Sequence, residues 1–135
     1  YYPDPASEYR QFEVDHIFPR SELERSNLVD NYGFSLERAE RFEDLRDNVR
    51  NLQLVSRNSN RRKSNKSFDE WIQTRSDDYL NRHLIPEDSS LYSVEQFDEF
   101  IQRRGELIVS RIRDMSEDIE STLGEELDAA GASAD

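Results

Sequence analysis

The sequence predicts an α+β fold, with a short two-stranded hairpin and a helix embedded in a mainly helical domain that ends in a long C-terminal amphipathic helix. Two segments, 11–15 and 51–55, alternate apolar and polar residues, which is the period of a β-strand. The polar and basic stretch 58–65 lacks this alternation and predicts the start of a helix. After residue 93, apolar residues recur every three to four positions or at multiples of that step, which predicts one face of a long helix.

In the first strand we expect Phe12 and Val14 to face the interior, and Pro19 soon follows the strand. The connecting segment contains 35–42, a short polar stretch that predicts a helix. The second strand, 51–55, is about as long as the first. Two strands followed by a helix is therefore the expected order within residues 11–66.

Two capping boxes predict helix starts in the remaining chain, one at Ser67 and one at Ser93. The second precedes the long helix, whose apolar residues suit core packing or docking against another part of a larger protein. These residues are Phe97, Ile101, Ile108, Ile112, Met115 and Ile119. We expect one domain over 1–121, divided into a finger at 11–66 and a helical part at 67–121, followed by a disordered acidic tail at 122–135.

The composition describes a modest domain with one core, since the chain has 135 residues and 34% hydrophobic content. It begins at Tyr1 without a methionine, as expected of a domain excised from a larger protein. No secretory signal and no apolar run of membrane-spanning length are present, so a soluble, cytoplasmic domain without a membrane partner is expected. Cysteine is absent, which excludes disulfides and thiolate-held zinc.

The charge balance is strongly acidic, with 30 acids, 18 bases and a net charge of -12. Only Lys63 and Lys66 are lysines, and the other bases are arginines. Acidity with few lysines is the bias of halophilic proteins, in which high internal salt screens self-repulsion. The alternative is an ordinary acidic protein that prefers arginine.

One segment reverses this balance. Arg50 to Lys66 holds six bases and no acid, whereas 1–49 carries 12 acids and 67–135 carries 18. The overall acidity argues against a nucleic-acid partner, but a basic island suits phosphate binding and reverses that argument locally. The alternative is a solvated basic helix face. The candidate phosphate-binding residues are Arg57, Arg61, Arg62, Lys63 and Lys66.

Asp15, His16 and Asn60 are the candidate chemical residues. Phosphodiester hydrolysis needs an activated water and a cation that stabilises negative charge. A histidine suits the first task, and hard oxygen ligands from Asp or Asn suit a magnesium-like ion. Singly, each signal is weak, because an isolated histidine is more often structural and asparagines often cap helices or form turns.

The segment Glu13-Val14-Asp15-His16-Ile17-Phe18-Pro19-Arg20-Ser21 resembles the first motif of HNH endonucleases. The stretches 51–55 and 56–63 resemble the second and third motifs. The resemblance implies a ββα-metal finger in which His16 is the general base and Asp15 and Asn60 are metal ligands, while Asn51 braces the loop presenting His16. It also implies one divalent ion, magnesium first, with manganese or nickel as alternatives.

Two positions depart from the pattern of many HNH enzymes. Ser56 and Ser59 stand where those enzymes carry cysteines for a structural zinc, so no structural zinc is expected. The third motif ends in Asn60 instead of histidine, which still offers a metal-binding oxygen.

Segments 81–86, 97–100 and 104–108 resemble the C-terminal portion of GmrSD-type restriction proteins. That resemblance implies a nuclease domain, with DNA as its partner, that follows an N-terminal nucleotide-dependent sensing domain in a restriction or anti-phage protein. Two alternatives are a non-catalytic nucleic-acid-binding module on the same fold and a protein-interaction module that uses the long helix.

Overall fold

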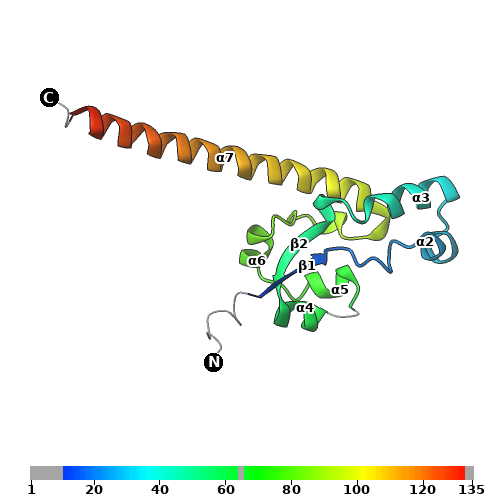
Figure 1. The fold of residues 1–135 in the computed structure, drawn as a ribbon. Coiled ribbons are helices and arrows are strands. Elements are labelled where there is room, and N and C mark those ends of the chain that lie inside the picture. The colour runs from blue at the N-terminus through cyan, green and yellow to red at the C-terminus, as the bar shows by residue number, and fades with distance from the viewer. Residues whose placement is uncertain (1–10, 64–65, 133–135) are drawn as a thin grey trace.

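The computed structural model describes residues 11–63 and 66–132 of the chain. A two-stranded sheet lies beside a group of short helices, and one long helix, α7 (Phe97–Ala132), runs along this body and projects beyond it (Figure 1). The mainly helical content with one strand pair confirms the predicted α+β fold. No helix among the described residues is both long enough and apolar enough to cross a membrane.

The two strands come from distant parts of the chain. β1 (Phe12–His16) pairs antiparallel with β2 (Leu52–Ser56), in a register that places Phe12 opposite Ser56 and His16 opposite Leu52. The intervening segment holds the helices α2 (Arg25–Tyr32) and α3 (Leu36–Leu45) and the 3-10 turn η1 (Val49–Asn51). α3 confirms the helix predicted near 35–42, whereas α2 was not predicted from the sequence.

The prediction that Phe12 and Val14 face the interior is wrong. Their side chains point to solvent, at 60% and 63% exposed, and Leu54 on the partner strand is 62% exposed. The interior face of the hairpin is instead the more polar one, where Asp15 is opposite Gln53. Burial of these polar groups is tolerated because each has a hydrogen-bond partner inside, as described below. The predicted alternation is therefore correct, but the residues that face inward are Glu13 and Asp15 instead of Phe12 and Val14.

Aromatic rings join the segment that follows β1 to the helical layer. Phe18 is fully buried and lies 4.3 Å from Phe68, 5.2 Å from Phe97 and 4.9 Å from Phe100, measured between ring centroids. These contacts connect the chain just after His16 to α5 (Phe68–Ile72) and to the first turn of α7. The end of β1 is therefore held against the main core.

The short helices are locally encoded. Ser67 Oγ accepts a hydrogen bond from the Glu70 backbone N–H at 3.2 Å, which confirms the predicted cap of α5. α6 (Asp77–Arg82) follows, and the 3-10 turns η2 (Ser89–Leu91) and η3 (Val94–Gln96) lead into α7. Ser93 precedes η3, but its side chain makes no capping hydrogen bond.

One buried arginine of α7 binds the backbone of two other segments of the chain. Arg104 donates from Nη1 to the Arg50 carbonyl at 2.8 Å and from Nη2 to the His83 carbonyl at 3.2 Å. Burial lowers the pKa of Arg104 to about 10, so the guanidinium remains charged at neutral pH. The first bond holds the backbone immediately before Asn51, and the second holds the end of α6.

The residues expected to form a disordered tail at 122–135 instead continue α7 as far as Ala132, and 133–135 lie outside the described residues. Residues 122–135 contain four alanines, two leucines and two glutamates, which are strong helix formers, and no proline, although they also include two glycines. Helical propensity there outweighs the acidic charge on which the tail prediction rested.

Candidate active site

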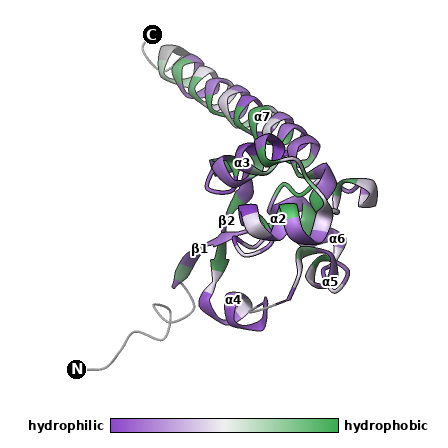
Figure 2. Ribbon diagram, turned by 90° about the vertical axis from the view of Figure 1, so that its right-hand side faces the viewer, coloured by the Kyte–Doolittle hydropathy of each residue, from purple (hydrophilic) through white to green (hydrophobic). Residues whose placement is uncertain are grey.

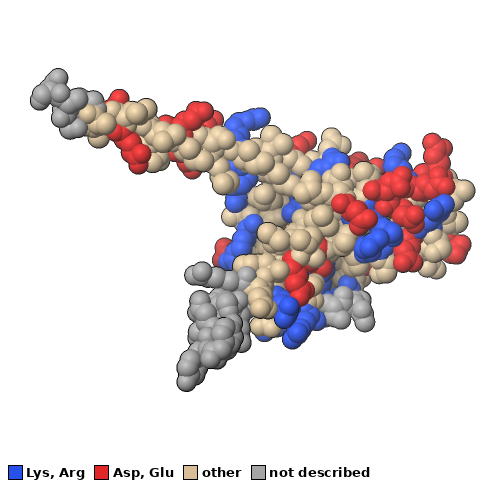
Figure 3. Space-filling view, viewed as in Figure 1, with Lys and Arg blue, Asp and Glu red and all other residues tan. Residues whose placement is uncertain are grey.

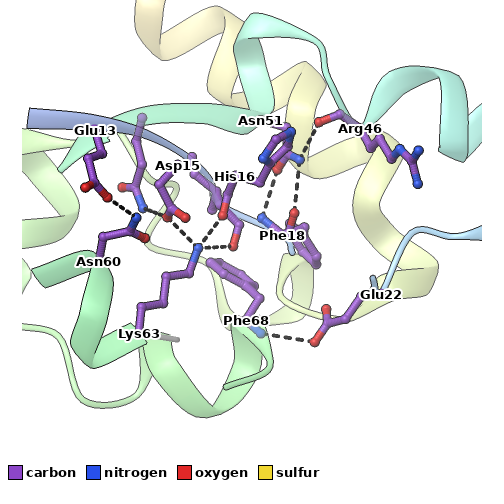
Figure 4. Close-up of polar contacts among 12 residues, drawn as sticks. Glu13, Asp15, His16, Phe18, Glu22, Arg46, Asn51, Asn60, Lys63 and Phe68 are labelled. Carbon is purple, nitrogen blue, oxygen red and sulfur yellow. Dashed lines mark hydrogen bonds and ion pairs between the residues drawn. The ribbon is translucent and has the colours of Figure 1, made fainter. Parts of the chain in front are cut away.

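The two strands and α4 (Arg57–Lys63) bring polar residues of the first and third sequence motifs together: Figure 4 shows Asp15 beside Lys63 and Glu13 beside Asn60. α4 starts directly at the end of β2, where Ser56 Oγ accepts a hydrogen bond from the Ser59 backbone N–H at 3.1 Å. That contact satisfies one of the free N–H groups of the first helical turn. The serine at this position thus caps the helix that carries Asn60.

Asp15 is bound to a buried lysine. Its Oδ2 accepts hydrogen bonds from Lys63 Nζ at 2.6 Å and from Gln53 Nε2 at 3.0 Å. The Lys63 ammonium also donates to the carbonyl oxygens of His16 and Ile17. All three ammonium hydrogens are therefore used, and Lys63 is only 3% exposed.

The environment of Lys63 is apolar on its other side, where its Nζ lies 4.9 Å from the centroid of the Trp71 ring. Desolvation by burial lowers the pKa of Lys63, and the neighbouring Asp15 carboxylate opposes that shift. Lys63 was expected to bind phosphate. Its position instead makes it the group that ties α4 to the end of β1.

Asn60 contacts the carboxylate of Glu13, which the sequence motifs did not identify as a site residue. Its Nδ2 donates to Glu13 Oε2 at 2.6 Å, and Arg57 Nε donates to Glu13 Oε1 at 3.2 Å. The hydrogen bond from Asn60 is the main reason that the pKa of Glu13 is lowered. Glu13 precedes Asp15 by two residues, so the two share a strand face, and that period could have indicated it.

His16 has a carboxylate partner on the loop that follows α3. Its Nε2 lies 2.7 Å from Asp47 Oδ1, and Arg20 Nε lies 3.6 Å from the same oxygen. The hydrogen bond with His16 lowers the pKa of Asp47, so the carboxylate is ionised at neutral pH. The sequence offered no signal for Asp47, because 31 residues separate it from His16.

Asn51 braces the chain beyond His16. Its side chain is fully buried, and Oδ1 accepts from the Phe18 N–H at 2.9 Å, while Nδ2 donates to the carbonyls of Phe18 at 3.2 Å and Arg46 at 2.8 Å. In addition, the Ile17 N–H donates to the Asn51 carbonyl at 2.8 Å. Through these contacts Asn51 joins the segment after β1 to the backbone at the end of α3.

The three residues expected to form one site lie on the same hairpin-helix unit, but they make no direct contact in the described residues. Asp15 binds Lys63 and Gln53, His16 binds Asp47, and Asn60 binds Glu13. Lys63 links the first two indirectly, because it donates to the Asp15 carboxylate and to the His16 carbonyl.

The donor set at this place fits a hard divalent cation. Among the described residues, no hydrogen bond occupies Asp15 Oδ1 or the amide oxygen of Asn60, and both are ligands that magnesium accepts. The part of the chain that the structure describes holds no group of three or more His, Cys, Asp or Glu side chains placed so that they could hold a metal ion. An ion at this site would therefore depend on Asn60 and on water molecules, which magnesium usually retains.

The remaining members of the basic island lie on the surface. Arg57, Arg61, Arg62 and Lys66 are exposed, on α4 and just beyond it. Figure 3 shows lysine and arginine gathered over the lower part of the molecule where α4 lies, while acidic groups dominate the face formed by α2 and α3. The positive surface is thus next to Asn60.

Comparison with known proteins gives one informative result. No curated protein and no solved structure matches the chain. The family model of the C-terminal domain of GmrSD restriction endonucleases matches residues 1–111, which include both strands, α4 and the first part of α7. The chain therefore belongs to the family of GmrSD restriction endonuclease C-terminal domains, a nuclease-related module.

Proposed function

We propose that this chain is a divalent-metal-dependent HNH endonuclease domain that hydrolyses DNA phosphodiester bonds. The observation that carries the proposal is the consecutive pair Asp15-His16 at the end of β1, each member with its own fixed partner. Lys63 positions the aspartate and Asp47 positions the histidine. A binding module has no use for a histidine oriented in this way.

His16 is the proposed general base. When its Nε2 carries the proton and donates to Asp47, Nδ1 is left as an acceptor that can take a proton from water. Asp47 acts as a positioning residue, since it holds the imidazole in one tautomer and one orientation. The brace formed by Asn51 fixes the backbone after His16, so the ring position depends on both contacts.

Asp15 and Asn60 are the proposed ligands of one divalent ion, magnesium first and manganese or nickel as alternatives. When bound, the ion would supply the positive charge that stabilises negative charge developing on the phosphate. Lys63 donates to Asp15 Oδ2 and so holds the carboxylate in one orientation from the interior side. Glu13 does the same for the Asn60 amide, because it accepts from Nδ2 and so directs the amide oxygen away from itself.

The exposed bases Arg57, Arg61, Arg62 and Lys66 are the proposed phosphate contacts on DNA. Contacts of this kind position a duplex without reading its sequence. The net charge of -12 would repel DNA as a whole, so binding depends on this local surface.

The family supports a place within a larger restriction or anti-phage protein, with an N-terminal nucleotide-dependent domain as the proposed partner that selects modified or foreign DNA. A second candidate, a non-catalytic DNA-binding module on the same fold, is favoured by the surface arginines alone.

A plasmid assay separates the two. The purified chain should convert supercoiled DNA into nicked or linear forms with magnesium or manganese, and a chelator should stop the reaction. Asn58→Ala changes an exposed residue on α4, the helix that carries Asn60, and serves as a control: it should leave the rate of plasmid cleavage unchanged. DNA binding that is insensitive to the chelator, without cleavage under any metal, would favour the binding module.

A further inference from the structure

The outer part of α7 presents a continuous apolar stripe to solvent. It consists of Val109, Ile112, Met115, Ile119, Leu123 and Leu127, which are between 52% and 72% exposed. The spacing of 3, 3, 4, 4 and 4 residues keeps all six on one face of the helix. This face continues the one that Phe97 and Ile101 bury against the body. Figure 2 shows green residues recurring along the projecting helix. A stripe of this length on an isolated helix marks an interaction surface.

Charge along the helix is distributed unevenly. Arg111 and Arg113 lie at the start of the exposed part, whereas the stretch from Asp114 to Asp128 carries seven acids and no base. Figure 3 shows this change from blue to red toward the C-terminus. A parallel pair of such helices would align the acidic stretches. An antiparallel pair brings the arginines of each helix to the level of Glu125, Glu126 and Asp128 of the other.

A groove lies at the base of the projecting part, where the helix leaves the body. It has a volume of about 700 Å³, and its apolar side is formed by Val49, Ile108 and Val109. Arg50 and Arg113 also line it, with Glu106, which is paired to Arg103 at 2.9 Å. Leu127 is the most exposed apolar residue of the stripe and lies between Glu126 and Asp128. An apolar side chain flanked by acids is complementary to an apolar groove flanked by arginines.

We propose that two copies of this chain pair antiparallel through the exposed part of α7, about a twofold axis near Ile119. In this arrangement the partner's Leu127 lies at the level of Arg111 and enters the groove between Val49 and Val109. The two helices then lie side by side over residues 109–129 of each copy, which is the exposed part of α7. The two bodies therefore lie at opposite ends of the pair, and each helix covers the stripe of the other.

The spacing follows from helix geometry. A rise of 1.5 Å per residue gives the 36-residue helix a length of about 54 Å, of which the 21 residues 109–129 account for about 31 Å. With the axis at Ile119, Met115 of one copy faces Leu123 of the other. Residue 115 of one copy would lie about 12 Å along the helix from residue 115 of the other, too far for a disulfide.

The mass of the full 135-residue chain in solution is the first test, measured by light scattering at about 100 µM, a concentration at which interfaces of modest size are populated. A dimer is expected in molar potassium chloride, where repulsion between the acidic copies is screened. Ile119→Lys should give monomer, because it replaces an apolar side chain at the centre of the interface with an ammonium group, whose burial is costly even where salt screens repulsion. Ser121→Lys adds the same charge on the opposite face of the helix and should remain dimeric.

Cysteine cross-linking then shows whether the two helices pair antiparallel or parallel. The chain has no native cysteine, so each disulfide comes from the introduced residues. Under mild oxidation, a mixture of Met115→Cys and Leu123→Cys chains should form mixed disulfides, while each variant alone should not. A monomeric wild type at low and high salt, a dimer that survives Ile119→Lys, or efficient cross-linking of Met115→Cys with itself would each overturn the proposal.

Discussion

The ammonium of Lys63 lies 2.6 Å from the carboxylate of Asp15, although 48 residues separate them in the chain. One salt bridge thereby joins the first motif, on β1, to the third motif, on α4. Lys63 also donates to the backbone carbonyls of His16 and Ile17, so it orients both the proposed metal ligand and the strand end that carries the proposed base. The geometry of the site depends on this interior cation.

Replacement of Lys63 should destabilise the fold. Lys63→Met removes the cation and leaves the Asp15 carboxylate, only 14% exposed, and two carbonyls without their donor. The expected loss in the free energy of unfolding is about 3 kcal/mol, as for other buried pairs that lose one partner. Urea unfolding measures it, and Lys66→Met, an exposed lysine nearby, is the control with little expected change. Equal effects for both variants would contradict the interior role of Lys63.

The stability of the fold should depend on the chemical identity of the side chain at Asn51 as well as on its size. Asn51→Asp keeps the volume but points carboxylate oxygens at the carbonyls of Phe18 and Arg46, which now accept from Nδ2. We expect Asn51→Asp to cost at least as much as Asn51→Ala, which should lose about 3 kcal/mol through three missing hydrogen bonds. Denaturant unfolding of the two variants checks the order. An aspartate variant as stable as the wild type would contradict the brace.

His83 should make the fold lose stability on mild acidification. It stacks on Tyr79, with ring centroids 4.1 Å apart, and desolvation, aided by Arg82 and Arg104, lowers its pKa. Around and below 6.5, the ordinary pKa of histidine, the unfolded chain therefore binds more protons at this residue than the folded chain does. The resulting stability is present above that pH and is lost as the pH falls through the unfolded pKa toward the lower folded one.

His83→Gln tests this assignment, because glutamine does not titrate. The difference in unfolding free energy between neutral and mildly acidic solution should be smaller in the variant than in the wild type. The carboxylates with lowered pKa values, Glu13, Glu43, Asp47 and Asp88, lose their contributions only at lower pH, and they are common to both proteins. An identical pH dependence in the two proteins would assign the loss to other groups.

The surface arginines of α4 should set the salt dependence of DNA binding. Arg61→Ala and Arg62→Ala should each weaken binding to any sequence and reduce the slope of log K against log salt by about 1. Arg41→Ala removes an exposed arginine from α3, away from this surface, and is the matched control. Titrations at several salt concentrations give the slopes. If Arg41→Ala had the same effect as the α4 variants, the phosphate surface would lie elsewhere.

Much of the architecture could be predicted from local patterns. The alternation in 11–15 and 51–55, the cap at Ser67 and the apolar spacing after residue 93 correspond to β1, β2, α5 and α7. Each of these signals lies within a few residues of the element that it describes. Helix α2 gave no such signal, since it has a weak apolar pattern and no side-chain cap at its start.

The orientation of the hairpin and the partners in the site could not be predicted in the same way. Alternation in β1 identifies two faces, but Asp15 faces inward because Lys63, from the distant α4, neutralises it there. The contact between His16 and Asp47 likewise depends on the path of α3 and η1. Such contacts follow from the tertiary fold, so a motif can name Asp15 and His16 without naming what holds them.

The most direct test of the central claim is the rate of plasmid cleavage by His16→Ala with magnesium or manganese. The account predicts a loss of at least about 100-fold, the usual contribution of a general base. The circular dichroism spectrum and the unfolding midpoint should remain close to those of the wild type, because His16 makes its side-chain contact at the surface, with exposed Asp47. Cleavage by a folded His16→Ala protein at the wild-type rate would contradict the proposed mechanism.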